Sequence, residues 1–223
     1  MTSYIGTYAE KSVHRDLKWR LEPTGAFHEV PVGKYIADIK TEAGITEIQT
    51  RQFHRLRAKL AEFLPGNTVV LVYPLTHEKI IQLVDPESGE IIRTRKSPKK
   101  GSFYDAFYEL YQIKPFLCDV NLIVRLVLVD VTERRSVNAN RRKHYDRTDA
   151  RIRAYREEML ICGIRDYKRL IPEGLNDRFT SAEYAAASGL NLRNAGIAVN
   201  VLNSVGAVER IGTQKRYYLY KRK

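Results

Sequence analysis

Several features are scarce in this sequence, and each scarcity excludes a class of protein. The 223 residues include only two cysteines, Cys118 and Cys162, which lie far apart. Their spacing excludes a disulfide framework and a zinc-binding pattern, and we expect both thiols to be reduced and buried. No apolar run approaches the roughly 18 residues of a membrane-spanning helix, and the first residues lack the order of a signal peptide. These absences predict a cytoplasmic protein.

Acidic residues are also in short supply. The chain has 38 lysines and arginines against 26 aspartates and glutamates, a net charge of +12. Residues 1–133 hold 18 basic and 17 acidic side chains, residues 134–169 hold 12 and 5, and residues 170–223 hold 8 and 4. A basic excess in one part of a chain is typical of proteins that bind a polyanion, and we expect nucleic acid before an anionic membrane. A solvated basic face without a partner is the alternative.

Hydrophobic residues make up 43% of the chain, which is enough for an ordinary core and excludes wholesale disorder. Apolar residues at helical spacing predict three helices in the first half, over residues 8–21, 53–64 and 103–111. Continuous apolar runs predict two central strands, over 68–73 and 122–131. Alternating residues predict one strand over 27–39, bent near Gly33, another over 45–50, and a hairpin over 80–94. The mixture predicts an α/β domain over residues 1–133.

The rest of the chain is predicted to hold two further parts. Residues 134–172 are rich in arginine and show no clean strand, so we expect a basic, mostly helical connector. From residue 173 onward, a capping box over Thr180–Glu183 begins one helix and Asn191 begins a second. Two short strands follow, with a basic tip between them. Helix, turn, helix and a two-stranded wing is the layout of a winged-helix domain over residues 173–223.

Two carboxylates near the start of the chain point to chemistry. If residues 41–44 connect the strands of the first hairpin, antiparallel pairing places Asp38 opposite Glu47, with their Cβ atoms about 5 Å apart. Carboxylates at that distance repel each other, and a hard divalent cation between them turns the repulsion into binding. Gln49 lies on the same strand face as Glu47 and can orient a water molecule. Such a group suits metal-assisted hydrolysis of a phosphodiester.

These residues resemble the motif of the PD-(D/E)XK nuclease superfamily, because Asp38 is followed after eight residues by Glu47-Ile48-Gln49. The glutamine stands where most members have lysine. The resemblance covers roughly residues 8–75 and implies a restriction-endonuclease-like mixed sheet flanked by helices. It also implies Mg²⁺ or Mn²⁺ held by Asp38, Glu47 and the backbone carbonyl of Ile48. Glu10, on the first helix, is the matching candidate for a further acidic catalytic residue.

The motif departs from the family pattern at two positions. Ala37 precedes Asp38 where proline is usual, and the missing lysine leaves the activation of water to another group, for which Lys59 and Lys40 are candidates. A solvent-exposed pair of acids with basic neighbours is the competing interpretation. None of the five histidines, His14 included, shows ligand spacing, and we expect them to be surface or hydrogen-bonded residues.

The winged-helix prediction supplies candidate DNA contacts. The polar face of its second helix is expected to read bases, and basic residues of the wing and of the loop after the second hairpin are expected to contact DNA. These residues are Arg193, Asn194, Asn200, Lys215, Arg216, Lys99 and Lys100. The sequence thus predicts a metal-dependent endonuclease acting on double-stranded DNA, and a homodimer if both strands are cut. The alternatives are a non-catalytic DNA-binding regulator with a degenerate nuclease fold, and an RNA-binding or repair accessory protein.

Overall fold

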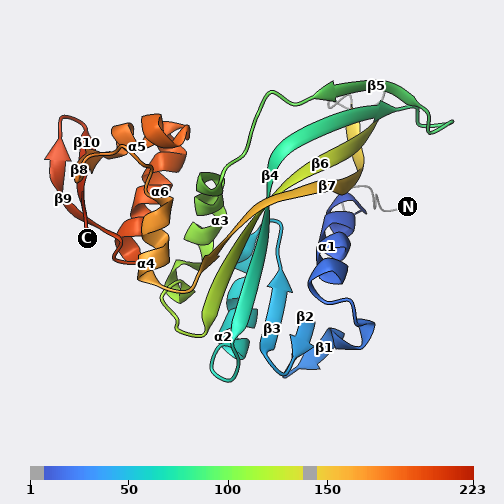
Figure 1. Cartoon of the computed structure of the whole chain (residues 1–223), viewed down its shortest axis with the longest axis horizontal. Coiled ribbons are helices and arrows are strands. Elements are labelled where there is room, and N and C mark those ends of the chain that lie inside the picture. The colour runs from blue at the N-terminus through green and yellow to red at the C-terminus, as the bar shows by residue number, and fades with distance from the viewer. Residues whose placement is uncertain (1–7, 138–144) are drawn as a thin grey trace.

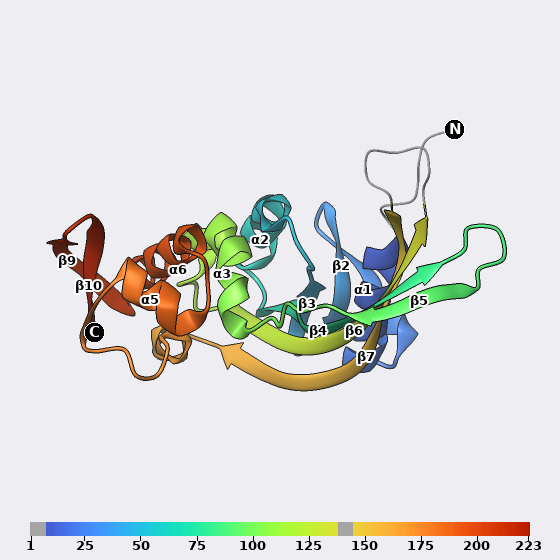
Figure 2. The ribbon, with the colours of Figure 1, turned by 90° about the horizontal axis from the view of Figure 1, so that it is seen from above.

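The computed structural model describes the backbone of residues 8–137 and 145–223, and in the first segment it describes side chains from Ser12 onward. A large, curved mixed sheet lies at the centre, and helices flank it (Figures 1 and 2). The predicted α/β architecture with a mixed sheet is confirmed at this level. In the described part of the chain, no helix combines the length and hydrophobicity that crossing a membrane requires.

The large sheet has seven strands in the order β1-β2-β3-β4-β6-β7, with β5 paired to β4. They are β1 (His28–Val32), β2 (Tyr35–Thr41), β3 (Gly44–Ile48), β4 (Val69–Val84), β5 (Ile91–Lys96), β6 (Leu122–Val137) and β7 (Tyr145–Ile161). β4 is parallel to both β3 and β6, and the other neighbouring pairs are antiparallel. Because β4 is covered on both faces, its first half is almost continuously apolar, as predicted for a central strand.

Helices cover this sheet and form much of the C-terminal part. The α-helices are α1 (Tyr8–Leu21), α2 (Arg57–Phe63), α3 (Phe107–Leu110), α4 (Ile164–Tyr167), α5 (Ser181–Ser188) and α6 (Leu192–Ser204). Short 3₁₀ helices are η1 (Gly25–Phe27), η2 (Phe53–Leu56), η3 (Phe103–Ala106), η4 (Tyr111–Phe116) and η5 (Lys168–Leu170). The predicted first helix is confirmed over its full length.

Two hydrophobic clusters fix the helices on opposite faces of the sheet. Val13 and Leu17 of α1 pack with Val72 of β4 in one cluster. Leu60 and Phe63 of α2 pack in the other, which includes alternate residues of β4 and β6. The spacing of these residues, four apart on α1 and three apart on α2, is that of a helix face. α1 and α2 therefore pack on opposite faces of the sheet, near the end of β3.

The segment predicted as one bent strand is a hairpin, so that prediction was wrong. Val32 of β1 pairs with Tyr35 of β2, and the chain reverses at Gly33, whose φ of +57° suits glycine. The apolar positions shift by one residue at the turn, from Val30 and Val32 to Tyr35 and Ala37. A shift of this kind fits a bend in one strand as well as a reversal, so the sequence pattern did not separate the two.

The prediction of a helical connector was also wrong, because residues 134–137 continue β6 and residues 145–161 form β7. Residues 150–154 alternate apolar residues with exposed arginines, as a half-buried strand does, but the many arginines of the segment obscure this alternation in the sequence. The arginines expected to line a helix lie on the two strands: Arg134, Arg135, Arg147, Arg151, Arg153 and Arg156. Arg141 and Arg142 lie outside the described residues. The cysteines also differ from expectation, since Cys118 and Cys162 are both exposed, each just after the end of an element.

Buried carboxylates of β6 hold several of these arginines. Glu133, only 1% exposed, accepts hydrogen bonds from Lys79 (2.9 Å), Arg135 (2.6 Å) and Arg147. Burial by itself raises the pKa of Glu133, but the hydrogen bond from Lys79 and the charge of Arg147 outweigh it and lower the pKa to about 2. This network ties β4, β6 and β7 together where they leave the main body of the sheet.

The C-terminal part has two helices and a small antiparallel sheet. Its strands β8 (Arg178–Thr180), β9 (Val208–Gln214) and β10 (Tyr217–Arg222) have the order β8-β10-β9. The predicted capping box is confirmed, since Thr180 and Glu183 exchange side-chain and backbone hydrogen bonds. Gly189, with φ of +71°, ends α5, and the side chain of Asn191 caps α6.

This C-terminal part packs directly on the large sheet's helices. α6 lies beside α3 and η4 (Figure 2), and one hydrophobic cluster runs from the large sheet into α5 and α6. Tyr184 of α5 is fully buried, lies edge-on to Tyr104 of η3, and donates a hydrogen bond to the carbonyl oxygen of Leu170 at 2.7 Å. The two parts therefore share a core rather than meeting only through a linker.

Replacing Tyr184 tests this shared core. We expect Tyr184→Ala to lower the free energy of unfolding by about 3–5 kcal/mol, because it leaves a large cavity between the two parts. Tyr184→Phe keeps the ring and loses only the hydroxyl bond, so it should cost about 1–3 kcal/mol. Urea titration followed by circular dichroism measures both. A loss under 1 kcal/mol for Tyr184→Ala would contradict a continuous core.

The Glu133 network predicts a pH-dependent stability. The folded pKa of about 2 lies below the value of 4.5 for a free glutamate, so the network's contribution is complete above pH 4.5 and is lost as the pH falls towards 2. We expect Glu133→Gln to destabilise the protein by on the order of 2 kcal/mol at pH 7. The difference from the unmodified protein should shrink steadily below pH 4. An unchanged difference at pH 7 and pH 3 would argue against the network.

Candidate active site

The β2–β3 hairpin brings the two predicted carboxylates together. Lys40 pairs with Ile45, as the sequence predicted, although the connecting turn has only two residues because Thr41 pairs with Gly44. Side chains then bridge the two strands. The backbone N–H of Asp38 donates to Glu47 Oε1 at 3.2 Å, and the backbone N–H of Ile48 donates to Asp38 Oδ2 at 2.8 Å. Each carboxylate is thus held by the strand that carries the other.

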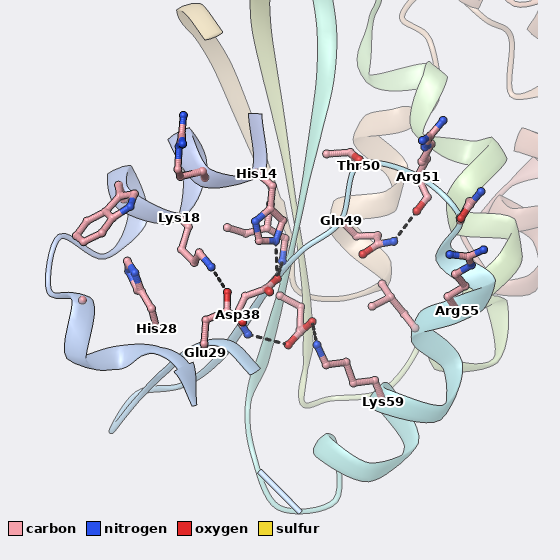
Figure 3. Close-up of a pocket in the computed structure, with 17 residues that line it drawn as sticks. His14, Lys18, His28, Glu29, Asp38, Gln49, Thr50, Arg51, Arg55 and Lys59 are labelled. Carbon is pink, nitrogen blue, oxygen red and sulfur yellow. Dashed lines mark hydrogen bonds and ion pairs between the residues drawn. The ribbon is translucent and has the colours of Figure 1, made fainter. Parts of the chain in front are cut away.

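Each carboxylate also has a basic partner from a different helix. His14 of α1 lies with its Nε2 atom 3.0 Å from Asp38 Oδ2, and Lys59 of α2 donates from Nζ to Glu47 Oε2 at 2.6 Å. Figure 3 shows both contacts, which reach the hairpin from opposite sides. The Glu47 side chain is 2% exposed and that of Asp38 is 15% exposed. The pair is therefore largely buried, with Asp38 nearer to solvent.

Burial and mutual repulsion set the charge of the pair. Burial and the charge of Asp38 raise the pKa of Glu47 to about 7, and Lys59 opposes this only in part. Burial also acts to raise the pKa of Asp38, but the hydrogen bond and charge of His14 and the hydrogen bond from Ile48 outweigh it and lower that pKa. Near neutral pH the second negative charge is therefore poorly balanced, as expected where two acids share one site.

A pocket of about 960 Å³ opens beside the carboxylates. One wall is the face of α1 that carries Arg15 and Lys18, and the opposite wall holds Arg51 and Arg55, after β3. Figure 3 shows Lys18 and Arg55 on opposite sides of Asp38. Lys18 also forms an ion pair with Glu29. Two acids at the centre and basic side chains on both walls create a site suited to a phosphate ester and a cation.

The other predicted site residues differ in whether they reach the pocket. Gln49 lines the pocket, and its amide Nε2 donates to the carbonyl oxygen of Arg51 at 2.6 Å. Lys40, one candidate for the missing lysine, donates to Asn67 instead, so Lys59 alone of the two meets the acids. Glu10 lies on α1, but its side chain lies outside the described part of the structure.

The sequence missed one member of the site and left another undecided. His14 was expected to be a surface or hydrogen-bonded histidine, and it is hydrogen-bonded, but the sequence did not indicate that its partner is Asp38. Its position one helical turn after Glu10 and one turn before Lys18 was the only available signal. Lys59 is one of the two candidate lysines, but its contact with Glu47 depends on the position of α2, which the sequence does not give. Both contacts depend on how the helices pack on the sheet.

Oxygen donors at this site fit a hard divalent cation in type, although they are few. Asp38 and Glu47 provide carboxylates. Burial and the charge of Asp38 raise the pKa of Glu47, and a bound cation would offset both effects. No group of three or more histidine, cysteine, aspartate or glutamate side chains suited to a metal ion is found within residues 12–137 and 145–223. Any ion held here would therefore take its remaining ligands from the backbone, water or substrate.

The predicted DNA contacts lie in three separate places. Arg193 is exposed at the start of α6 and Asn194 is half-buried, whereas Asn200 accepts a hydrogen bond from Lys114 of η4 at 2.9 Å. The face of α6 that carries Asn200 therefore borders the large domain. Lys215 and Arg216 form the exposed two-residue turn between β9 and β10, where the wing tip was predicted.

The two lysines of the loop after β5 are exposed but have acidic partners. Lys99 lies 3.1 Å from Asp105, and Lys100 lies 3.4 Å from Glu78. Surface ion pairs of this kind are weak, so both lysines stay able to exchange these partners for phosphates.

Comparison with known proteins gives one relative and one family. A protein of Treponema pallidum (strain Nichols), named "Uncharacterized protein", is 35% identical over 126 residues, which are 56% of this chain and 50% of the relative. The chain thus spans about half the length of the curated relative that it matches. No solved structure matches the chain. Residues 11–162, which contain the whole large sheet and the pocket, match a family model, and the chain belongs to that family, described as "Domain of unknown function (DUF8091)".

Proposed function

We propose that this protein is a metal-dependent nuclease that hydrolyses DNA phosphodiester bonds in the pocket beside Asp38 and Glu47. The observation that carries the proposal is the convergence of these two acids, from adjacent strands, at the centre of a pocket with basic walls. Buried acids held close together cost stability, and their repulsion is useful where a cation is bound. The basic walls suit a phosphate backbone.

The order of elements around the pocket supports the same proposal. A helix precedes the three antiparallel strands β1, β2 and β3, a second helix follows, and β4 then pairs with β3 in parallel. This is the arrangement implied by the resemblance to PD-(D/E)XK nucleases, and the acids stand on β2 and β3, where that resemblance expects them. We therefore interpret the large domain as restriction-endonuclease-like.

In this proposal, Asp38, Glu47 and the backbone carbonyl of Ile48 hold Mg²⁺ or Mn²⁺. A bound divalent cation polarises the phosphate and lowers the pKa of water, which is what hydrolysis of a phosphodiester requires. Both carboxylates can accept it only when ionised, and the hydrogen bonds from Ile48 and from the Asp38 backbone orient their oxygens. In the structure, His14 contacts Asp38 and Lys59 contacts Glu47, at the oxygens that would hold the cation.

Lys59 is the residue that takes the place of the missing motif lysine. Its ammonium lies against Glu47, 21% exposed and directed into the pocket wall. From that position it can stabilise negative charge that develops on the phosphate and orient a water molecule near the acids. The Gln49 amide donates a hydrogen bond to the backbone carbonyl oxygen of Arg51. In this proposal, Gln49 is an uncharged residue of the pocket wall and holds the chain in place just after β3.

Two further regions suit DNA binding away from the pocket. β5 is exposed along its whole length, and its Arg93 and Arg95 line a groove of about 350 Å³ together with Arg135 of β6. No acidic residue lines this groove among the described residues. We interpret the C-terminal helices and strands as a winged helix, in which Lys215 and Arg216 contact phosphates and Arg193 reaches towards bases.

Replacing either carboxylate tests the catalytic proposal. We expect Asp38→Ala and Glu47→Ala each to lower the rate of Mg²⁺-dependent cleavage of DNA by at least about 10²-fold. Glu62→Gln, which removes an exposed acid of α2 paired with Lys34, is the matched control and should cut at the normal rate. Cleavage that survives both alanine substitutions would contradict the site. Tight DNA binding without any cleavage by the unmodified protein would favour the regulator.

The β5 groove gives a second test, on binding alone. We expect Arg93→Ala with Arg95→Ala to weaken binding to DNA of any sequence and to reduce the slope of log affinity against log salt by about 2, since each phosphate contact contributes roughly 0.9. Fluorescence anisotropy over a salt series measures this slope. Lys34→Ala, an exposed charge at the β1–β2 turn, should leave the slope nearly unchanged. An unchanged slope in the double variant would exclude the groove as a DNA contact.

A further inference from the structure

Trp19 stands at the edge of the same pocket and has no part in the proposed chemistry. It is the only tryptophan of the chain, it lies on α1, and its side chain is 51% exposed. It lines the pocket together with Asp38 and Glu47. A half-exposed indole ring at the edge of a polar pocket offers a flat apolar surface to a molecule bound there.

The ring is held in place rather than left loose. His28 lies edge-on to it, with ring centroids 4.7 Å apart and an interplanar angle of 74°. Nε2 of His28 lies 2.8 Å from the carbonyl oxygen of Glu22 and can donate to it, which fixes the imidazole. Gly25 packs against the ring so closely that a Cβ atom there would lie 3.3 Å from it. The indole is therefore a fixed platform with part of its surface open to solvent.

The platform and the acids line the same pocket. Residues 14, 15, 18 and 19 form one face of α1 towards the pocket, and His14 on this face contacts Asp38. His14 and Trp19 are five positions apart on the helix, a rise of about 7.5 Å along its axis. Arg15, exposed on the same face of α1, adds positive charge beside the pocket, where it can contact the phosphates of a DNA strand.

We propose that Trp19 stacks on an unpaired base next to the phosphate that is cut. Aromatic rings on a basic surface are the common platform for single-stranded DNA, because every base has a face that can stack. Inside a continuous duplex, both faces of each base are already covered by its neighbours. The substrate class of the pocket is therefore DNA with unpaired nucleotides at the cut, such as a single strand or a flap. This proposal rests on the proposed function of the same pocket.

Intrinsic fluorescence gives a direct test, since all tryptophan emission comes from this one ring. The unmodified protein is titrated, with Ca²⁺ in place of Mg²⁺, with a single-stranded oligonucleotide and with a closed hairpin duplex of equal charge. We expect the single strand to quench the emission and to bind more tightly than the duplex. An emission that neither DNA changes at saturation would overturn the proposal.

Substitution of the ring supplies the second readout. Trp19→Ala should weaken binding of the labelled single strand by about 5- to 100-fold, because one base stack is lost, and should leave duplex affinity nearly unchanged. Trp19→Phe should retain part of the affinity. Tyr108→Ala, at an aromatic residue of α3 that is 53% exposed outside the pocket, is the matched control and should bind normally. Circular dichroism confirms that each variant is folded.

The outcomes separate this proposal from the proposed function. Suppose that the single strand quenches the emission and Trp19→Ala selectively loses single-strand affinity, but the unmodified protein cleaves no DNA. This result would support the base platform and contradict the proposed nuclease activity. Mg²⁺-dependent duplex cleavage at the same rate in Trp19→Ala, with equal affinity for both DNA forms, would support the nuclease and overturn the platform.

Discussion

Two acids that repel each other are held together across the β2–β3 hairpin, and the rest of the site is arranged around that repulsion. The backbone of each strand donates a hydrogen bond to the carboxylate of the other, so the hairpin cannot relax by turning one acid away without leaving a backbone N–H unpaired. Helices from both faces of the sheet then each supply a basic side chain. The site therefore depends on α1, α2 and the hairpin being packed on one sheet, and this packing rests on the two hydrophobic clusters.

The long strands extend this site into a larger surface. β4 and β6 begin in the core beside the pocket, where both faces are apolar, and continue into an arm where polar and charged side chains are mixed with apolar ones such as Ile81 and Val84. The buried carboxylates of Glu133 and Asp130 hold the arm's arginines in fixed positions. Glu133 binds Arg135 and Arg147, and Asp130 binds Arg153 and Arg156. One continuous sheet thus carries a polar pocket near its middle and basic residues towards one end, which suits a partner as long and uniformly charged as DNA.

Local patterns predicted much of this from the sequence, and long-range packing explains what they missed. The hairpin register, the central strands and the caps of α5 and α6 follow from turn residues and apolar spacing, which act within a few positions. The β6–β7 arm escaped because arginines stand between the alternating apolar residues of β7, and the turn at Gly33 because a shift of the apolar positions by one residue fits a bend as well as a reversal. Of the site, Asp38 and Glu47 were accessible through the register. His14 and Trp19 were not, since their roles depend on where α1 lies relative to β2.

The most direct measurement of the central claim is a crystal structure of the protein with Mn²⁺, using anomalous scattering to locate the ion. We predict one manganese peak within coordination distance of a carboxylate oxygen of Asp38 and one of Glu47. An intact Lys59–Glu47 ion pair with no anomalous peak between the acids, at millimolar Mn²⁺ and a pH above 7.5, would contradict the account.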